Sequence, residues 1–483
     1  MKSLQDLLYR VPIIEVFGST NQQVSQICQD SRLVHPKDVF VAVKGEHTDG
    51  HQHISAALNA GASVIVCEHI PADILPEITY VRVSDSARSL AVLAANFYEN
   101  PAQKLKIIGV TGTNGKTTVA TILHQLMLEL GVGAGLISTV CIKINEQKLP
   151  ASHTTPDALQ LHYYFNEMLI AGCSYCFMEV SSHALVQQRT AGIPFTGALF
   201  TNITHDHLDY HQTFQQYIGA KQLLFNGLSK GSFAITNIDD KNGLIMVQNT
   251  GARVLKYALH RPADYTAKII EKLLHGLHLY LDGKDSWFKL TGTFNAYNLL
   301  CAYATACELG FNKDEILLGL SKVTGAPGRF QIHISPNNRI GIVDYAHTPD
   351  ALQNVLETIK ELNHHSGKII VVVGCGGDRD NEKRPKMGKI ASYFADLAIF
   401  TSDNPRSEPA DKILQMMLTG VPYAQKSKVQ LIENRKSAIE TAVTLAEPND
   451  IILVAGKGHE TYQEIQGTKY PFDDFKIIQE ILK

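Results

Sequence analysis

Short apolar runs alternate with amphipathic stretches along the whole chain of 483 residues. Strands that alternate with helical segments are typical of βα units, so this pattern predicts an α/β protein with a mostly parallel sheet. Turn-forming residues interrupt the pattern near 99–101 and near 324–328. At ~150 residues per domain the length fits three domains, which we expect at 1–100, 101–328 and 329–483.

A glycine-rich turn joins a predicted strand at 105–110 to a predicted helix. The turn reads Gly-Val-Thr-Gly-Thr-Asn-Gly-Lys-Thr-Thr at 109–118. Backbone N–H groups of such a turn bind phosphate, while Lys116 would reach the terminal phosphates and Thr117 would offer a hydroxyl to Mg²⁺. Val110 stands where the strict pattern has glycine, so we interpret the segment as a variant P-loop. An ordinary glycine-rich turn is the alternative.

Polar clusters follow two later apolar runs, at the point where each predicted strand ends. The run at 174–180 delivers Glu179, and the run at 197–203 is followed by His-Asp-His at 205–207. Ligands bind beyond the carboxyl ends of strands in open α/β sheets, and a carboxylate with an imidazole near a P-loop would suit a second divalent cation. For each residue alone a surface turn is the alternative, since His-Asp-His is also favourable where a helix begins.

A lysine lies in the apolar stripe that is predicted for the helical segment 214–225. Lys221 falls at helical spacing from Ile218 and Phe214, on the face that packs inward. Burial would lower the pKa of its amine. A neutral amine can react with CO₂ to form a carbamate, which replaces a cation with a metal-binding anion. The alternative is a lysine at the edge of the stripe whose ammonium group reaches water.

The charge balance excludes several classes of protein. The 44 Lys and Arg residues against 47 Asp and Glu residues give a net charge of −3, without the basic excess that many phosphate contacts to nucleic acid need. No apolar run approaches the ~20 residues of a membrane span, so we expect no membrane insertion. The segment 1–12 lacks the apolar core of a secretion signal, and we therefore expect a cytoplasmic protein.

Three apolar runs near the C-terminus each lead into a polar turn, at 374–379, 403–406 and 456–460. Turns at the carboxyl ends of neighbouring strands form one crevice. Arginines that bind carboxylates and acids that bind ammonium groups suit an amino acid there. The turn at 374–379 is no dinucleotide fingerprint, because Arg379 occupies its third glycine position. For Asp-Asn-Pro-Arg at 403–406 the alternative is a capped helix that begins at proline.

Five segments resemble motifs of the Mur ligases of peptidoglycan synthesis, in the same order along the chain: 112–118, 179–185, 201–211, 292–298 and 328–330. The segments 30–32 and 40–45 also fit. The resemblance implies an α/β protein of three domains: one that binds the UDP precursor, a central P-loop ATPase-like domain with a mostly parallel sheet, and a C-terminal Rossmann-like domain that binds the amino acid. These domains would close over the substrates.

The family's activity would be an ATP-dependent, ADP-forming ligation through an acyl phosphate, with Mg²⁺, in cell-wall biogenesis and hence in cell shape and division. Asp-Asn-Pro-Arg at 403–406 resembles the branch that adds meso-diaminopimelate to UDP-MurNAc-dipeptide. The lysine-adding ligases and the folate polyglutamate ligases are alternatives within the superfamily. A P-loop switch or transport ATPase is an alternative from another class, but it would not explain the C-terminal turns. We expect small-molecule substrates and a monomer.

The resemblance also implies roles for individual residues. The nucleotide would be bound by Gly112, Thr113, Asn114, Gly115, Lys116, Thr117, Thr118, Asn295, Asn298, Arg329 and Asp344. The metal would be held by Thr117, Glu179, His207 (preferred over His205) and Lys221 as a carbamate, and the catalytic set would be Lys116, Glu179, His207, Lys221 and Arg329. The UDP precursor would contact Ser31, Arg32, Thr154, Thr155, Ser181 and Arg189. The amino acid would contact Arg379, Asp403, Asn404, Pro405, Arg406, Gly456 and Glu460.

Overall fold

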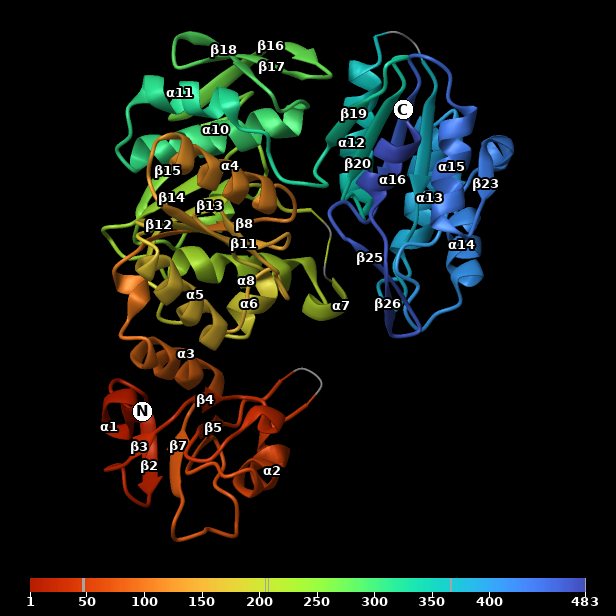
Figure 1. The fold of residues 1–483 in the computed structure, drawn as a ribbon. Coiled ribbons are helices and arrows are strands. Elements are labelled where there is room, and N and C mark those ends of the chain that lie inside the picture. Colours follow the sequence, from red (N-terminus) through yellow and green to blue (C-terminus); the bar gives the residue numbers. More distant parts are fainter. Residues whose placement is uncertain (46–47, 205, 207, 365–366, 483) are drawn as a thin grey trace.

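The structure is a computed structural model that describes residues 1–45, 48–204, 206, 208–364 and 367–482. The predicted metal ligand His207 and its neighbour His205 lie outside the described residues. The three larger sheets lie between residues 13 and 83, 106 and 288, and 331 and 455, and each falls inside one of the ranges expected for the domains. Figure 1 shows the three parts as an N-terminal, a central and a C-terminal unit.

The N-terminal unit is built on a mixed sheet in the order β2-β7-β6-β5-β4. Strands β4 to β7 pair in parallel, and β2 pairs antiparallel with β7 at one edge. Helix α3 lies between this sheet and the central unit (Figure 1). The elements are β1 Lys2–Ser3, α1 Leu4–Leu7, β2 Ile13–Phe17, β3 Gln23–Val24, β4 Ile27–Cys28, β5 Val39–Val41, α2 Ile54–Asn59, β6 Val64–Cys67, β7 Thr79–Val83 and α3 Ser86–Phe97.

The central unit has a long sheet in the order β11-β10-β9-β12-β8-β13-β14-β15-β16-β17-β18. Strands β9 to β16 in this order pair in parallel, whereas the strands at both ends pair antiparallel. The strands are β8 Lys106–Thr111, β9 Ala134–Ile137, β10 Ile142–Ile144, β11 Gln147–Leu149, β12 Tyr175–Glu179, β13 Phe195–Phe200, β14 Phe233–Asn237, β15 Arg253–Ala258, β16 Tyr265–Leu273, β17 Gly276–Leu281 and β18 Lys284–Phe288.

Helices cover both faces of this sheet. Buried side chains of α4, α10 and α11 pack on one face, and those of α5 and α8 pack on the other. The chain leaves β8 toward β9 on one side and later returns to β13 on the other side, so the carboxyl end of β8 is a topological switch point. The helices are α4 Lys116–Glu129, α5 Ala158–Ile170, α6 Ser182–Val186, α7 Leu208–His211, α8 Phe214–Asn226, α9 Gly243–Met246, α10 Thr293–Glu308 and α11 Lys313–Lys322.

The C-terminal unit has a second open sheet, in the order β19-β20-β24-β21-β22-β23, with β19 antiparallel and the other strands parallel. Helices α12 to α14 pack on one face, and α15 and α16 pack on the other. The elements are β19 Gln331–Ile334, β20 Ile340–Asp344, α12 Pro349–Leu362, β21 Ile369–Val373, α13 Lys383–Phe394, β22 Leu397–Phe400, α14 Ala410–Thr419, β23 Val429–Leu431, α15 Arg435–Leu445, β24 Ile451–Ala455, β25 Tyr462–Ile465, β26 Thr468–Pro471 and α16 Asp474–Ile481.

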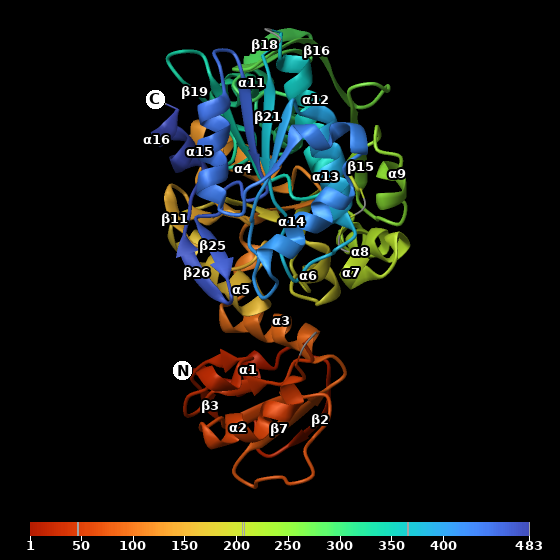
Figure 2. The same cartoon turned by 90° about the vertical axis from the view of Figure 1, so that its right-hand side faces the viewer.

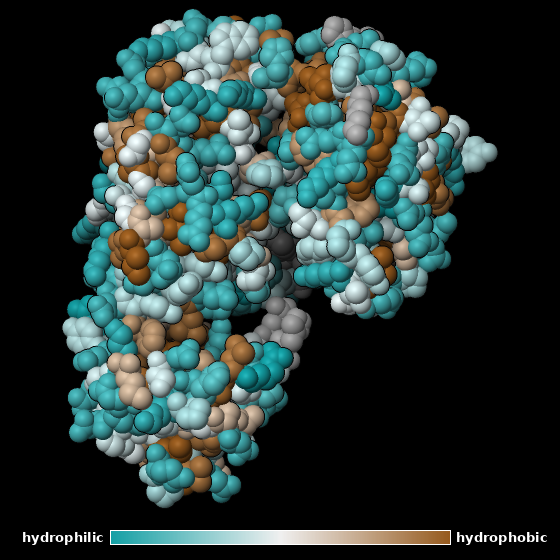
Figure 3. Space-filling model, viewed as in Figure 1, coloured by the Kyte–Doolittle hydropathy of each residue, from teal (hydrophilic) through white to brown (hydrophobic). Residues whose placement is uncertain are grey.

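These sheets confirm the expected α/β class with mostly parallel strands. In the part of the chain that the structure describes, no helix has the length and apolar character that would let it cross a membrane. The central and C-terminal units lie side by side in Figure 1, and the C-terminal unit lies in front of the central one in Figure 2. Figure 3 shows a hollow in the surface where they meet.

A buried ion pair fixes the C-terminal helix. Arg435 at the start of α15 donates from Nε and Nη2 to the two carboxylate oxygens of Asp474, at 2.8 and 2.7 Å, and neither side chain is exposed. Arg435 Nη2 also donates to the carbonyl oxygen of Ala455 at the end of β24. The pair therefore ties α15, α16 and the carboxyl end of a central strand together.

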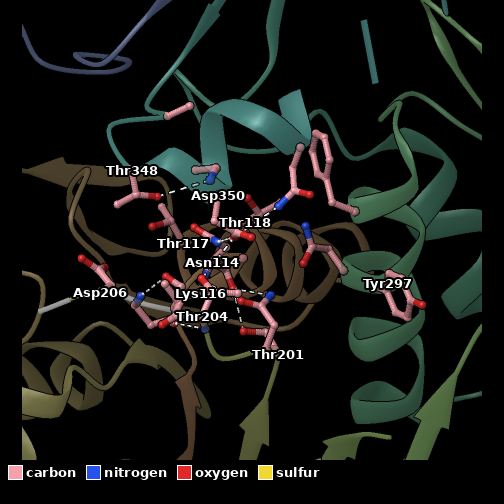
Figure 4. A pocket seen from close by; sticks show the side chains of 18 of the residues that line it. Asn114, Lys116, Thr117, Thr118, Thr201, Thr204, Asp206, Tyr297, Thr348 and Asp350 are labelled. Atoms are coloured by element: carbon pink, nitrogen blue, oxygen red, sulfur yellow. Dashed lines mark hydrogen bonds between the residues drawn. The ribbon is translucent and has the colours of Figure 1, made fainter. Parts of the chain in front are cut away.

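A contact between units involves Asp350 in the first turn of α12. Its Oδ2 accepts hydrogen bonds from Asn114 Nδ2 of the glycine-rich turn at 3.0 Å and from Thr204 Oγ1 at 3.1 Å (Figure 4). Because one carboxylate oxygen of the C-terminal unit accepts from two side chains of the central unit, it links the position of α12 to the conformation of that turn.

We expect Asp474→Ala to lower the free energy of unfolding by about 3–5 kcal/mol, because it leaves the Arg435 charge buried without its carboxylate. The measurement is thermal and urea unfolding of the full chain. The control is Lys476→Ala, which removes an exposed ammonium group 3.8 Å from Asp473, and we expect a change of at most ~0.5 kcal/mol. Equal stability of Asp474→Ala and wild type would contradict the structural role of the pair.

We expect Asp350→Ala to loosen the contact between the units by about 1–3 kcal/mol, because Asn114 and Thr204 lose their shared acceptor. Hydrogen exchange of the amides in 112–116 and 348–352 should become faster, since local opening sets these rates. Glu357→Ala is the matched control: Glu357 lies on the same helix and accepts from Gln353 of that helix. Unchanged exchange in Asp350→Ala would show that the contact does not hold the units together.

Candidate active site

A cavity of about 590 Å³ lies between the central and C-terminal units, at the carboxyl ends of β8, β12 and β13. This volume lies in the usual range for small-molecule sites. Figure 4 shows side chains of both units around it. Its lining residues include Thr113, Asn114, Gly115, Lys116, Thr117, Thr118, Thr139, Thr154, Glu179, Ser181, Thr204, Asp206, Lys221, Asp239, Tyr297, Asn298, Arg329, Asp344, Tyr345, His347 and Asp350.

The glycine-rich turn wraps the start of α4. Gly112 has φ +149° and Gly115 has φ +86°, and a Cβ at Gly115 would lie 2.7 Å from Asn298 Oδ1. Both positions therefore require glycine. Asn202, just after β13, holds the turn in place: Thr113 N donates to the Asn202 carbonyl and Asn114 N donates to Asn202 Oδ1. The first residues of α4 line the cavity, and the N-terminus of a helix favours a bound anion.

Lys116 and Thr117 begin helix α4 and line the cavity. Lys116 Nζ donates to the carbonyl oxygens of Gly112 at 3.0 Å and Thr113 at 2.8 Å. Loss of water lowers the pKa of Lys116, and the carboxylates of Glu179 and Asp206 offset only part of this effect. Thr117 Oγ1 donates to Glu179 Oε1 at 2.8 Å.

Glu179 is held at the end of β12 by two donors. Its Oε1 accepts from Thr117 Oγ1 and, at 2.7 Å, from Thr139 N. Arg329 enters from the segment before β19, and its Nη2 donates to Thr117 Oγ1 at 3.1 Å. Its guanidinium carbon lies 4.5 Å from the centre of the Tyr345 ring. The structure therefore brings Lys116, Thr117, Glu179 and Arg329 together, although 212 residues separate Thr117 from Arg329.

Lys221 is buried in the inward face of α8, with 1% of the residue exposed. The alternative of an ammonium group that reaches water is therefore wrong. Lys221 Nζ donates to the Gly112 carbonyl at 2.8 Å and lies 4.6 Å from the centre of the Tyr217 ring. Burial lowers the pKa of Lys221 far below that of a free lysine, and the positive charge of Lys116 lowers it further. Two ammonium groups thus compete for one carbonyl oxygen.

Asp344 and Asn298 also line the cavity. Asp344 Oδ2 accepts from Phe330 N at 2.6 Å and Oδ1 accepts from Ala346 N at 2.8 Å. Burial raises the pKa of Asp344 to about 6, against the opposing effect of Arg329. Asn298 lines the cavity, whereas Asn295 is absent from the described lining residues. Asn295 instead accepts from Asn298 Nδ2 at 3.0 Å.

The residues predicted for the UDP precursor fall into two groups. Thr154 and Ser181 line the cavity. Thr155 lies behind them: its hydroxyl donates to the Glu179 carbonyl, and its own carbonyl accepts from Arg189 Nη1 at 2.8 Å. Ser31 and Arg32, in contrast, belong to the short 3-10 helix Ser31–Leu33 of the N-terminal unit and are not brought to the cavity. Arg32 is exposed there and pairs with Asp30 at 2.6 Å.

The three turns of the C-terminal unit that were predicted to form one crevice contact one another. Gly377 N donates to the Asn404 carbonyl, and a Cβ at Gly456 would lie 2.5 Å from Asp403 Oδ2. Arg406 Nη1 donates to the Gly377 carbonyl at 2.6 Å, and Asn404 Nδ2 donates to Glu460 Oε2 at 2.8 Å. Arg379 is exposed, and its Nη1 donates to the Asp378 carbonyl.

The segment 403–406 is a loop, so the alternative of a helix that begins at Pro405 is wrong. Helix α14 begins only at Ala410. Arg406 has φ +51°, the left-handed region that a non-glycine residue rarely adopts. Arg406 N donates to the Glu464 carbonyl, and Gln466 N donates to the Arg406 carbonyl. These hydrogen bonds to β25 and to the turn after it stabilise the left-handed conformation of Arg406, which is incompatible with a helix. Such backbone strain is common at binding sites.

Three residues of the sites had no predicted role. Asp350 contacts the glycine-rich turn, Tyr345 stacks on Arg329, and Lys457 is buried in the C-terminal crevice. Asp350 follows Thr348 and Pro349, so in sequence it resembles an ordinary acid in the first turn of a helix. Within the described residues no group of three or more His, Cys, Asp or Glu side chains is arranged to hold a metal ion.

Three family models match the chain. They are "Mur ligase family, catalytic domain" at residues 23–98, "Mur ligase middle domain" at 110–306, and "Mur ligase, glutamate ligase domain" at 328–458. Together they cover most of the N-terminal, central and C-terminal units.

Full-length relatives and a solved structure agree with these matches. A protein of Cytophaga hutchinsonii is 53% identical over 480 residues, covering 99% of each chain, and one of Phocaeicola vulgatus is 47% identical over 478 residues, again covering 99% of each. Both are named UDP-N-acetylmuramoyl-L-alanyl-D-glutamate--2,6-diaminopimelate ligase. A solved structure of a protein of that name has a TM-score of 0.69 and 31% identity, covering 100% of this chain and 98% of its own. The chain therefore belongs to the Mur ligase family of ATP-dependent amide ligases.

Proposed function

We propose that this protein uses ATP to join meso-diaminopimelate to UDP-N-acetylmuramoyl-L-alanyl-D-glutamate in peptidoglycan synthesis. The main support for the proposal is that the C-terminal unit contributes residues both to the predicted amino-acid site and to the P-loop. The C-terminal unit contains the crevice with Arg406 and Glu460, and the adjoining Arg329 reaches Thr117 of the P-loop. An amino acid in the crevice and a phosphate on the P-loop would thus be held by the same unit. The names of the full-length relatives support these substrates.

The chemistry is amide formation in two displacements. An oxygen of the D-glutamate γ-carboxylate attacks the γ-phosphorus of ATP, and ADP leaves with the electrons of the broken P–O bond. The amine of diaminopimelate then attacks the carbonyl carbon of the acyl phosphate, loses a proton, and phosphate leaves. Two anions must meet in the first displacement, so Lys116 and Arg329 would act by neutralising charge and positioning both groups.

The residues at the P-loop fit a Mg²⁺ ion. Mg²⁺ prefers oxygen ligands and is usually held by one or two carboxylates together with substrate phosphates. The Thr117 hydroxyl and the Glu179 carboxylate lie 2.8 Å apart at the start of α4 and would hold the ion, which would neutralise phosphate charge. The proposed ligand His207 lies outside the described residues, and Lys221 would take part as a carbamate.

Burial and the neighbouring charge support the carbamate at Lys221. A lysine that loses its proton in the protein is a nucleophile for CO₂: the N–C bond forms, one proton leaves, and an N-carboxylate results. This anion would remove the competition between two ammonium groups for the Gly112 carbonyl, since Lys116 could then pair with the carboxylate.

The precursor would extend from the cavity toward the N-terminal unit. Thr154, Thr155, Ser181 and Arg189 would bind near its peptide, and Ser31 and Arg32 would bind its uridine end. Because these two groups lie on different units, we propose that 1–100, 101–328 and 329–483 act as domains that close on the substrates. We also propose that the protein works as a monomer in the cytoplasm.

The experiment that tests this function is a coupled assay of ADP release with the full chain. ADP should appear only when UDP-N-acetylmuramoyl-dipeptide and diaminopimelate are both present. Lysine and glutamate are tested in place of diaminopimelate. Turnover with lysine at a rate equal to that with diaminopimelate would contradict the proposed specificity, and turnover with glutamate alone would favour a folate-type ligase.

We expect Lys221→Ala to lower turnover by about 10³-fold, because the site loses an anion that neutralises charge in the reaction. Added CO₂ should not restore the rate, whereas a short-chain carboxylic acid should restore part of it. Lys230→Ala, which changes an exposed lysine shortly after the same helix, is the control. Labelled CO₂ should give a carbamate carbon signal by NMR in wild type. Wild-type turnover of Lys221→Ala would exclude the carbamate.

We expect Arg406→Ala to raise the KM for diaminopimelate about 10²-fold with an unchanged KM for ATP. A site that pairs a charge with the correct substrate discriminates by up to about 10⁴ against an analogue that lacks the matching charge. Lysine lacks the distal carboxylate, so the variant should also show a smaller preference for diaminopimelate over lysine. Arg339→Ala, on a surface turn of the same unit, is the control. An unchanged KM for diaminopimelate would show that Arg406 does not bind its carboxylate.

A further inference from the structure

Lys457 is a lysine without any solvent exposure in the turn between β24 and β25. A buried ammonium group requires partners that replace its water. It lies between Gly456 and Gly458, which have φ +113° and φ +53°, so the backbone of this turn adopts conformations that suit glycine. The proposed roles of the crevice residues leave the function of this cation open.

Lys457, Asn404 and Glu460 form a closed triangle of hydrogen bonds. Lys457 Nζ donates to Asn404 Oδ1 and to Glu460 Oε2, each at 2.9 Å, and Asn404 Nδ2 donates to the same Glu460 Oε2 at 2.8 Å. Glu464 N also donates to Asn404 Oδ1 at 2.9 Å. Because two donors point at Oδ1, the orientation of the Asn404 amide is fixed and its NH₂ group faces the carboxylate.

The triangle leaves one oxygen of Glu460 for a ligand. Oε2 accepts from both Lys457 and Asn404, whereas Oε1 has no protein donor among the described residues. The Glu460 side chain is 18% exposed, so its carboxylate is not sealed inside the protein as Lys457 is. The same crevice contains Arg406, whose Nε lies 3.6 Å from Glu464 Oε2.

We infer that Lys457 is a positioning residue for the incoming amino acid: it fixes the Glu460 carboxylate and the Asn404 amide so that Glu460 Oε1 accepts the ammonium group at the distal end of diaminopimelate. The inference rests on the proposed function. Lys457 does not touch the substrate but acts through Glu460 and Asn404.

The charges of the crevice support this role. The crevice contains two ion pairs, Lys457–Glu460 and Arg406–Glu464, and each pair has a net charge of zero. The distal end of diaminopimelate also sums to zero, with one ammonium and one carboxylate group. Without Lys457 the crevice would carry an extra negative charge, and the Asn404 amide could rotate. The crevice would then bind a simple cation such as lysine better relative to diaminopimelate.

The test is the steady-state kinetics of Lys457→Met in the full chain, with diaminopimelate and with an analogue that lacks its distal amino group. We expect a rise of about 30-fold or more in the KM for diaminopimelate, because truncating one partner of a buried charge pair is costly. The KM values for ATP and for the UDP precursor should stay within about twofold. The analogue should lose less in kcat/KM than diaminopimelate does, because it has no ammonium group for Glu460 to accept and responds only to the extra negative charge of the crevice.

Lys469→Met is the matched control. Lys469 is exposed, and its Nζ lies 4.4 Å from the centre of the Tyr462 ring, which Lys457 Nζ approaches to 5.5 Å. The substitution therefore removes an ammonium group near the same Tyr462 ring and leaves the hydrogen bonds among Lys457, Asn404 and Glu460 unchanged. The KM for diaminopimelate should be that of wild type.

A second variant separates positioning from folding. In Lys457→Met with Glu460→Gln no charge of the pair remains buried, so this double variant should fold even if the single variant does not. Its KM for diaminopimelate should equal that of Glu460→Gln alone, because Lys457 acts through Glu460. Additive losses would overturn the inference.

Three further results would also overturn it: an unchanged KM in Lys457→Met, an equal loss with the analogue, or an equal rise in the KM for ATP. If wild type does not use diaminopimelate at all, the proposed function fails and this inference fails with it. If wild type uses diaminopimelate and Lys457→Met does so equally well, the inference alone fails.

Discussion

Buried positive charge is the constraint on which the sites of this protein depend. A cation that leaves water must find acceptors inside the protein, and the acceptors differ from site to site. Arg435 is matched by the two oxygens of Asp474, so its charge is satisfied by the fold itself. Lys457 shares its carboxylate with an amide and leaves one oxygen for a ligand. Lys221 donates to a carbonyl oxygen that Lys116 also uses, which favours loss of a proton.

These sites are also coupled through the position of the C-terminal unit. Arg329 and Asp350 both reach the glycine-rich turn from outside the central unit, one at the Thr117 hydroxyl and the other at the Asn114 amide. The cavity therefore has its complete wall only when the two units lie together. A nucleotide bound there would contact both units, so its binding would stabilise their closure. This arrangement suits a reaction whose activated intermediate must be kept from water.

Much of the fold follows from local sequence, whereas the sites depend on contacts between distant residues. Apolar runs that end in glycine or polar turns predict strands, and the strands at 106–111, 175–179 and 451–455 lie within a few residues of the predicted ones. The burial of Lys221 also follows from its position on an apolar stripe. Asp350 gives no such signal, because its partner Asn114 lies 236 residues away. Lys457 stands between two glycines, and no periodic pattern there shows which side chain is buried.

The segment 403–406 shows why local patterns cannot settle a binding site. Asparagine followed by proline is as suitable for the start of a helix as for a loop. The loop is selected by the hairpin β25–β26, because Arg406 exchanges backbone hydrogen bonds with 464–466 and Glu464 N donates to Asn404. Figure 2 shows this hairpin at one end of the C-terminal unit. The conformation of the crevice is thus set by residues that follow it by 60 positions. Changes in the hairpin would therefore alter the proposed amino-acid site even where 403–406 stays the same.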